Sequence, residues 1–156
     1  MLRTPRSEAV IAAKPARPRR TAASRQVLAG IVVACIDNEE TILSGMRALL
    51  EGWGATVIAA STQATLLQEI ARSGTVPDAI IADYHLDDGH TGLEVIAAVR
   101  SRLAPQMFAI LATADRSATL RSAASQADIH LLNKPLKPAA LRALLSSVSQ
   151  ERAAAE

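Results

Sequence analysis

The sequence predicts an α/β fold in which a five-stranded parallel sheet lies between two layers of helices. Five short apolar runs alternate with five segments whose apolar residues recur at helical spacing. The runs contain almost no polar residues, which is typical of strands that are buried on both faces. Strands of this kind, joined through helices by right-handed crossovers, form a doubly wound sandwich of three layers.

A chain of 156 residues is long enough for one domain with a hydrophobic core and for an extension. Hydrophobic residues make up 49% of the chain and aromatic residues only 2%, so that Ala, Leu, Ile and Val must fill the core. The single cysteine, Cys35, lies within an apolar run and is expected to be buried without a disulfide. No segment approaches the ~20 apolar residues of a membrane-spanning helix, and the N-terminus lacks the apolar stretch of a secretory signal. We therefore expect a cytoplasmic protein that contacts no membrane.

The charge is distributed unevenly along the chain. Residues 1–28 contain seven of the 17 Lys and Arg and one of the 15 acidic residues, so the net charge of +2 conceals a mildly acidic remainder. Residues 1–27 contain three prolines and no sustained periodicity, which predicts a disordered basic arm. Such an arm is a solvated leader or linker, or it attracts nucleic acid, a membrane or an acidic partner. From the folded domain itself, predicted over residues 28–150, we expect no nucleic-acid binding.

The first apolar run predicts a strand over residues 28–36, which ends at the carboxylate of Asp37. Apolar residues then recur at helical spacing and predict a helix over residues 39–51, which Gly52 would end. The run over residues 55–60 predicts the second strand.

The second helix begins at a hydroxyl cap, which is either Ser61 or Thr62, and it is closed by Gly74 and Pro77. The third strand follows at once and ends abruptly at Asp83. A polar turn that contains glycine separates this strand from the next helix.

The third helix has Thr91 as its cap, and Arg100 and Arg102 lie near its C-terminal end, where a helix favours positive charge. The fourth strand is predicted over residues 107–112 and is followed by Thr113.

A weaker helix, rich in small residues, is predicted over residues 116–124, and the fifth strand over residues 128–132. Pro138 then opens the last helix in the first-turn position that proline favours. Residues 151–156 are expected to be frayed.

Polar side chains stand at the carboxyl ends of four of the five predicted strands. The first strand leads to Asp37 and Asn38, the third to Asp83, the fourth to Thr113 and the fifth to Lys134. Because the carboxyl ends of parallel strands meet at one edge of the sheet, we expect these side chains to share one small site.

This set of residue types indicates phosphoryl transfer to an aspartate. Two neighbouring carboxylates repel each other unless a cation neutralises them, and oxygen ligands with retained waters suit Mg²⁺. A bound Mg²⁺ neutralises the charge of a phosphoryl group during in-line transfer, and a carboxylate can be the nucleophile and become an acyl phosphate. Asp83 would accept the phosphoryl group, Lys134 would pair with one phosphoryl oxygen, and Thr113 would donate a hydrogen bond to another.

Four segments, each at a strand end, recur together in one known family. They are Ile36-Asp37-Asn38-Glu39, Ile80-Ile81-Ala82-Asp83, Ala112-Thr113-Ala114 and Leu132-Asn133-Lys134-Pro135. In this order, over residues 29–149, the sequence resembles the receiver domain of two-component response regulators, of the kind attached to hybrid histidine kinases. The resemblance implies the flavodoxin-like strand order 2-1-3-4-5.

The resemblance also implies a role for each residue of the site. Asp83 is the phosphoacceptor, Thr113 is the switch hydroxyl and Lys134 binds the phosphoryl group. The Mg²⁺ ligands implied are Asp37, Asn38, Asp83 and the backbone carbonyl of His85. The peptide bond before Pro135 is usually cis in this family.

Two positions depart from the pattern of the family. Asn38 stands where a second acid is common, so that the affinity for Mg²⁺ should fall. The amide still accepts a hydrogen bond from a metal-bound water, and the neighbouring Glu39 is a candidate to compensate for the missing charge. Leu131 replaces the switch aromatic, so that an aromatic flip coupled to Thr113 is not available.

We therefore expect a phosphorelay receiver, a signalling domain that assists its own phosphotransfer and dephosphorylation but is not an enzyme. Its donor would be a histidine kinase or a histidine phosphotransfer protein. Because the chain ends about one helix after Lys134, output is expected to pass through a partner protein or another part of a longer chain, and a homodimer is compatible with this role.

Two alternatives remain open from the sequence. The departures at Asn38 and Leu131 suggest a receiver-like interaction module without phosphate turnover. The basic arm suggests nucleic-acid binding, which the acidic charge of the remainder does not favour.

Overall fold

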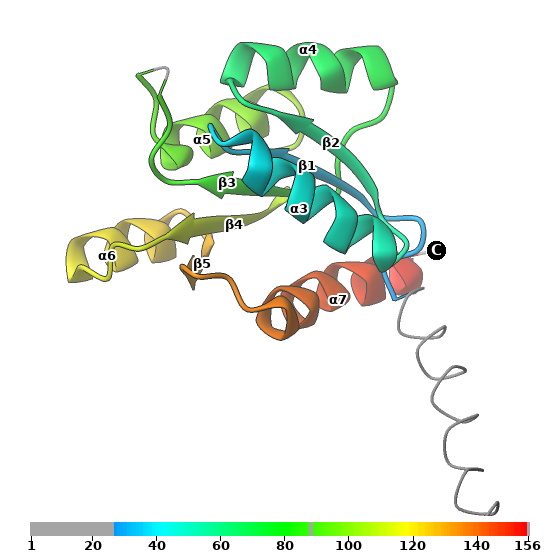
Figure 1. The fold of residues 1–156 in the computed structure, drawn as a ribbon. Coiled ribbons are helices and arrows are strands. Elements are labelled where there is room, and N and C mark those ends of the chain that lie inside the picture. The colour runs from blue at the N-terminus through cyan, green and yellow to red at the C-terminus, as the bar shows by residue number, and fades with distance from the viewer. Residues whose placement is uncertain (1–26, 88, 156) are drawn as a thin grey trace, which may run out of the picture.

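The computed structural model describes residues 27–87 and 89–155, which form a three-layer α/β sandwich (Figure 1). The five parallel strands have the order β2-β1-β3-β4-β5, which confirms the predicted doubly wound fold and its strand order. The predicted arm, apart from Val27, lies outside the described residues. In chain order the elements are β1 (Val32–Ile36), α3 (Glu40–Gly52), β2 (Thr56–Ala60), α4 (Gln63–Ser73), β3 (Ala79–Asp83), α5 (Gly92–Arg102), β4 (Phe108–Thr113), α6 (Ala118–Gln126), β5 (His130–Asn133) and α7 (Pro138–Ala155).

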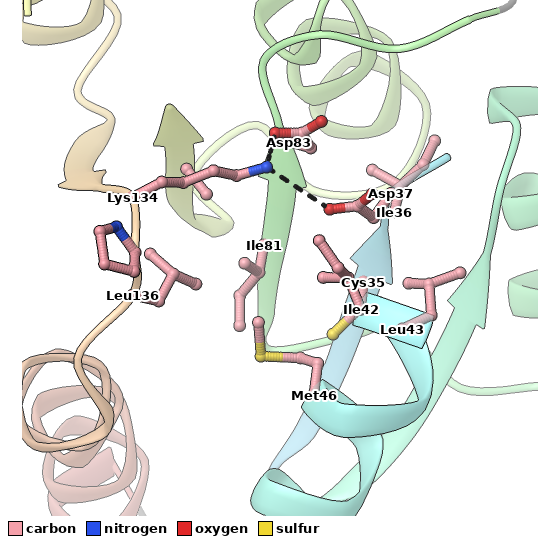
Figure 2. A pocket seen from close by; sticks show the side chains of 12 residues that line it. Cys35, Ile36, Asp37, Ile42, Leu43, Met46, Ile81, Asp83, Lys134 and Leu136 are labelled. Carbon is pink, nitrogen blue, oxygen red and sulfur yellow. Dashed lines mark ion pairs between the residues drawn. The ribbon is translucent and has the colours of Figure 1, made fainter. Parts of the chain in front are cut away.

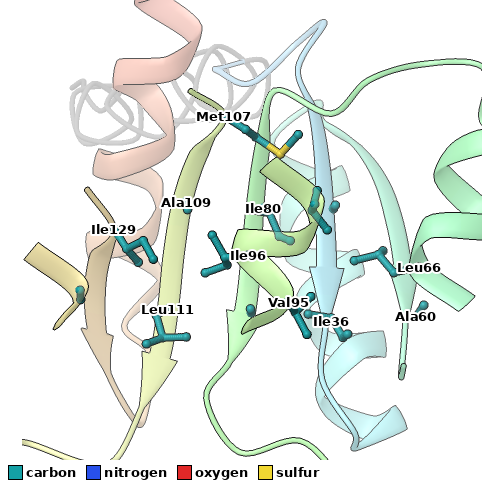
Figure 3. Packing of buried hydrophobic residues seen from close by; sticks show 14 of the residues in the cluster. Ile36, Ala60, Leu66, Ile80, Val95, Ile96, Met107, Ala109, Leu111 and Ile129 are labelled. Atoms are coloured by element: carbon teal, nitrogen blue, oxygen red, sulfur yellow. The ribbon is translucent and has the colours of Figure 1, made fainter. Parts of the chain in front are cut away.

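The sheet separates two hydrophobic cores, and successive residues of each central strand point to opposite cores. Helices α4, α5 and α6 cover one face, where Ile80 of β3 packs in the same cluster as Ile96 of α5 and Leu111 of β4 (Figure 3). Helices α3 and α7 cover the other face, which includes Ile81 of β3 and Ile110 of β4. Because β3 is the central strand and all its residues are buried, its last residue is held at the carboxyl edge by packing from both sides.

The first strand begins later than the sequence predicts. Residues 28–31 form a turn, in which the Ile31 N–H donates to the Leu28 carbonyl and Gly30 adopts a φ of 84°. A left-handed residue breaks the extended conformation, so that β1 starts only at Val32. Leu28 is nevertheless fully buried, which explains why the apolar run continues before the strand.

The fifth strand is also shorter and later than predicted. Asp128, the first residue of the predicted strand, has a φ of 57° and belongs to a turn. The guanidinium of Arg100 donates to the carbonyls of Ala127 and Asp128, at 2.7 and 2.8 Å, and fixes that turn. The strand therefore begins at His130, after the turn is complete.

The last two helices differ from the prediction at their ends. Helix α6 begins two residues later than expected, because the side chain of Ser117 accepts a hydrogen bond from the Leu120 N–H and caps it. The end of the chain, expected to be frayed from residue 151, continues as part of α7 to Ala155. Arg152 anchors this segment, since its guanidinium donates to the Gly30 carbonyl and to the Asp78 carboxylate. Among the described helices, none has the length and apolarity needed to cross a membrane.

The first turn of α5 lies directly against the backbone of Asp83. The Gly92 N–H donates to the Tyr84 carbonyl at 2.9 Å, and Thr91 and Glu94 form a capping box that fixes the start of the helix. A Cβ atom added to Gly92 would lie 2.4 Å from the Asp83 carbonyl oxygen and 2.5 Å from Cδ1 of Leu111. The close approach of α5 to the end of β3 therefore requires glycine at this position.

We expect Gly92→Ala to lower the free energy of unfolding by about 2–3 kcal/mol, because the methyl group meets backbone that cannot move independently. Gly45→Ala is the matched control, since Gly45 is an exposed interior residue of α3 whose Cβ would contact nothing within 4 Å. It should raise the free energy of unfolding by roughly 0.5–1 kcal/mol. Urea denaturation measures both changes; equal effects of the two substitutions would contradict the packing described here.

Candidate functional site

The register of the sheet brings the ends of β3, β4 and β5 to one edge. Asp83, the last residue of β3, pairs with Ala112, and Thr113 pairs with Asn133 across the next ladder. The backbone N–H of Lys134 donates to the Thr113 carbonyl at 2.9 Å, which extends the ladder beyond β5. On the other side of β3, Asp37 directly follows β1. Its backbone N–H donates to the carbonyl of Ala60, the last residue of β2, so Asp37 lies at the same edge of the sheet.

Lys134 lies between two carboxylates at this edge (Figure 2). Its Nζ is 2.6 Å from Oδ1 of Asp83 and 3.9 Å from Oδ2 of Asp37. Both aspartates are buried, each with 6% of its surface exposed. The peptide bond between Lys134 and Pro135 is cis, as the resemblance implied.

Burial has the largest effect on the ionisation of Asp37. Removal from water raises the pKa of Asp37, and the charge of Asp83 raises it further. The backbone N–H of Glu39, 2.9 Å from Oδ1 of Asp37, lowers this pKa, as does the ammonium of Lys134. The net shift of the Asp37 pKa is upward, so that the Lys134 ammonium and the Glu39 N–H do not fully offset the cost of burying this carboxylate.

Thr113 is buried at the end of β4, with 1% of its surface exposed. Its Oγ1 accepts a hydrogen bond from the Asp115 N–H at 2.9 Å, and Ser117 rather than Thr113 caps the following helix. Because that bond uses the hydroxyl oxygen as an acceptor, the hydroxyl proton remains able to donate.

The other predicted members of the site lie on the loops above the sheet. Asn38 donates from Nδ2 to Oδ2 of Asp87 at 2.9 Å, a contact that the sequence did not indicate because it joins residues 49 positions apart. His85 pairs with Thr91 in an isolated antiparallel bridge at the base of its loop. Among the described residues, no hydrogen bond uses the His85 carbonyl oxygen.

The residues present fit a hydrated Mg²⁺ ion in their donor chemistry. Within the described part of the chain, no three His, Cys, Asp or Glu side chains form a group able to hold a metal ion. The available set is two carboxylates, Asp37 and Asp83, together with the neutral oxygens of Asn38 and the His85 carbonyl. Mg²⁺ usually retains several waters and takes only one or two carboxylates from the protein, so this set suffices.

An apolar pocket of about 270 Å³ adjoins the ion pairs. Figure 2 shows Asp83 and Lys134 at one end of this pocket and Met46 of α3 at the other. Most of the wall is apolar, and burial raises the pKa of Cys35 to about 12, so that its thiol is not a reactive group at neutral pH. The pocket could not be predicted from the sequence, because its wall combines α3 with the loop after β5. The apolar residues of this wall are Cys35, Ile36, Ile42, Leu43, Met46, Ile81, Ala112, Pro135 and Leu136.

The fold and the site together define a class of protein: a doubly wound domain with paired acids and a lysine at the carboxyl edge of its sheet. The family profile of the response regulator receiver domain matches residues 33–146. The chain therefore belongs to this family, whose members are signalling domains of two-component systems.

Individual relatives agree with this assignment. The phyllosphere-induced regulator PhyR of Methylorubrum extorquens is 29% identical over 114 residues, which cover 73% of this chain and 42% of that regulator. This chain thus spans less than half the length of that relative. A response regulator receiver domain protein from Clostridium thermocellum superposes with a TM-score of 0.71 at 21% identity, over 81% of this chain and 99% of that one. The chemotaxis protein CheY4 of Vibrio cholerae gives 0.67 at 22% identity, over 76% and 98%. At these identities the two structures support the fold alone.

The raised pKa of Asp37 leads to a prediction for the protein in EDTA. A carboxyl whose pKa is higher in the folded than in the unfolded state binds its proton more tightly when folded, so its ionisation destabilises the fold. We expect Asp37→Asn to raise the melting temperature at pH 7 by about 2–4 °C, corresponding to roughly 1 kcal/mol. The gain should shrink as the pH falls through the folded pKa of Asp37, where the wild-type side chain becomes neutral. Melting curves over a pH series measure this, and a lower melting temperature of Asp37→Asn at pH 7 would contradict it.

Proposed function

We propose that this protein is a phosphorelay receiver that accepts a phosphoryl group on Asp83 from the phosphohistidine of a kinase or phosphotransfer protein. The observation that carries the proposal is the ammonium of Lys134 between two buried carboxylates, at the edge where the receiver family places its site. The pairing supports the roles predicted for Asp83 and Lys134. A cytoplasmic location, predicted from the sequence, remains part of this proposal.

The chemistry assigned to Asp83 is an in-line displacement at phosphorus. One carboxylate oxygen attacks, the new P–O bond forms as the P–N bond of the phosphohistidine breaks, and the departing imidazole takes a proton from solvent. Lys134 already contacts Oδ1 of Asp83, so that its ammonium is in place to pair with a phosphoryl oxygen. Thr113 would donate its hydroxyl proton to another phosphoryl oxygen.

The cation site is proposed to contain Asp37, Asp83, Asn38 and the backbone carbonyl of His85. Mg²⁺ bound there supplies positive charge that offsets the charge of the transferred group. The chain keeps the carboxylates of Asp37 and Asp83 away from bulk water, since both residues are buried. Hydrolysis of the acyl phosphate, which returns the domain to its resting state, would take place at the same site.

The apolar pocket supports a docking role for the surface beside Asp83. A donor must bring its phosphohistidine to the Asp83 carboxylate, so the donor protein has to cover the adjoining surface. That surface is a groove between α3 and the loop after β5, with Ile42 and Met46 on one wall and Leu136 on the other. Half-buried apolar side chains of this kind form the centre of protein interfaces.

Output after phosphorylation would depend on protein contacts, through a partner or another part of a longer chain. Leu131 packs against the core at the position where the family has its switch aromatic. A change that starts at Thr113 would therefore be transmitted through the loop between β4 and α6, where the Asp115 N–H contacts the Thr113 hydroxyl.

Acetyl phosphate with MgCl₂ should label wild-type protein on Asp83, as read by mass spectrometry of the intact chain and its peptides. Asp83→Asn should abolish the label, because the amide is not a nucleophile toward phosphorus. Asp128→Asn is the matched control. Asp128 is exposed and precedes β5, at the edge of the sheet opposite to Asp83, and asparagine readily adopts its φ of 57°.

An unlabelled wild type, with Mg²⁺ present and a folded protein by circular dichroism, would contradict the proposal. It would favour instead a receiver-like interaction module that does not turn over phosphate.

Met46→Glu should reduce transfer from a phosphorylated histidine phosphotransfer domain by at least about tenfold, because it places a charge in an apolar interface. Labelling by acetyl phosphate, which needs no protein docking, should change less than about twofold. Leu67→Glu on α4 is the control for lost stability, since Leu67 is also half-buried but packs against the other core. Equal loss of both labelling reactions in Met46→Glu would rule out a docking role.

A further inference from the structure

One hydrogen bond joins the two loops above the site. Nδ2 of Asn38, in the loop between β1 and α3, donates to Oδ2 of Asp87, in the loop between β3 and α5, at 2.9 Å. Asn38 directly follows Asp37, whose carboxylate lies 3.9 Å from the ammonium of Lys134. The contact therefore links an acid outside the predicted site to a residue within it.

The chemistry of the pair fixes the orientation of the amide. An ionised carboxylate only accepts hydrogen bonds, so in this contact the nitrogen of the Asn38 amide, and not its oxygen, must face Asp87. The amide oxygen then faces away from Asp87 and keeps its capacity as an acceptor. Without a charged partner the amide would be free to present either atom.

The loop that carries Asp87 is anchored at its base. His85 pairs with Thr91 across the loop, and the Gly92 N–H donates to the Tyr84 carbonyl at 2.9 Å. The capping box of α5 fixes the following residues. Asp87 thus reaches Asn38 from a loop whose two ends are tied together.

Position 38 also lacks the negative charge that the family commonly has there, and Asp87 brings a charge to the same amide. The sequence suggested Glu39 as the residue that compensates for the charge missing at position 38. Its side chain is exposed and takes part in no hydrogen bond or ion pair with the described residues. Glu39 acts on Asp37 through its backbone N–H and through its charge. The directional contact to the Asn38 amide is made by Asp87.

We propose that Asp87 is a positioning residue of the cation site, which orients the Asn38 amide oxygen for a cation-bound water and supplies the charge that position 38 lacks. This inference rests on the proposed function, because the cation is the Mg²⁺ of the phosphotransfer site. Outer contacts of this kind influence metal affinity although they do not touch the ion.

Calorimetric titration of the purified chain with MgCl₂ tests the role of Asp87 without any phosphotransfer. Asp87→Asn should weaken Mg²⁺ binding about three- to tenfold, because it removes the charge and the fixed orientation together. The exchanged pair Asn38→Asp with Asp87→Asn should restore affinity to within about twofold, since an amide at position 87 can donate to a carboxylate at position 38. Glu39→Gln, which removes an equal charge from the neighbouring position, should change affinity less than about twofold.

A double-mutant cycle separates positioning from charge at a distance. In an Asn38→Ala background there is no amide to orient, so adding Asp87→Asn should cause a clearly smaller further loss of Mg²⁺ affinity than in wild type, because only the charge of Asp87 is then removed. A further loss equal to that in wild type would show that Asp87 acts without Asn38 and would overturn the positioning role.

Failure of this inference is distinguishable from failure of the proposed function. Wild type that binds Mg²⁺ and is labelled on Asp83, with Asp87→Asn binding Mg²⁺ as tightly, would overturn the inference alone. Wild type that does not bind Mg²⁺ would overturn both. Because Asp87 is exposed on a loop, circular dichroism should show an unchanged fold in the variants.

Discussion

Two buried carboxylates that share a single ammonium form the constraint on which this structure depends. Burial of two carboxylates at one edge of the sheet is costly, and Lys134 lies 2.6 Å from Asp83 and 3.9 Å from Asp37. For Asp37 the ammonium offsets that cost only in part, since the pKa of this carboxyl remains raised. The arrangement exists because parallel strands deliver their carboxyl ends to one edge, and because β3 is held between two hydrophobic cores. An incompletely neutralised site is suited to receive a cation and an anionic group together, which is the chemistry that we propose for this receiver domain.

The sequence predicted the fold well because its strongest signals are local. Buried strands followed by amphipathic helices need no knowledge of distant residues, and the doubly wound sheet that they predict was confirmed. The strand order, which the family resemblance implied, was confirmed as well. The wrong predictions concern the starts of two strands, where a distant residue or a residue with a positive φ determines the first residue of the strand. The strand expected from residue 28 begins at Val32 because Gly30 turns the chain, and the strand expected from residue 128 begins at His130 because Arg100 fixes a turn at Asp128. Hydrophobicity alone contains no information on such turns.

The candidate site likewise has residues that the sequence predicted and surroundings that it did not. Asp37, Asp83 and Lys134 could be brought together from the sequence, because each follows an apolar run and the topology supplies the rest. The partner of Asn38 could not be predicted, since Asp87 lies in a polar turn whose composition indicates only solvent exposure. The apolar pocket beside Asp83 was also beyond prediction, because its wall combines a helix with a loop from the other end of the domain. What the sequence missed is therefore the surroundings of the site, to which we assign the proposed roles in Mg²⁺ binding and in docking of the donor.

The most direct test of the central claim is a crystal structure of the chain with Mg²⁺ and beryllofluoride, a stable mimic of the phosphoryl group. We expect beryllium bonded to a carboxylate oxygen of Asp83, the Nζ of Lys134 within hydrogen-bond distance of a fluoride, and Mg²⁺ in contact with Asp37. The mimic bound elsewhere, or Asp83 unmodified and still paired with Lys134 at saturating concentrations, would contradict it.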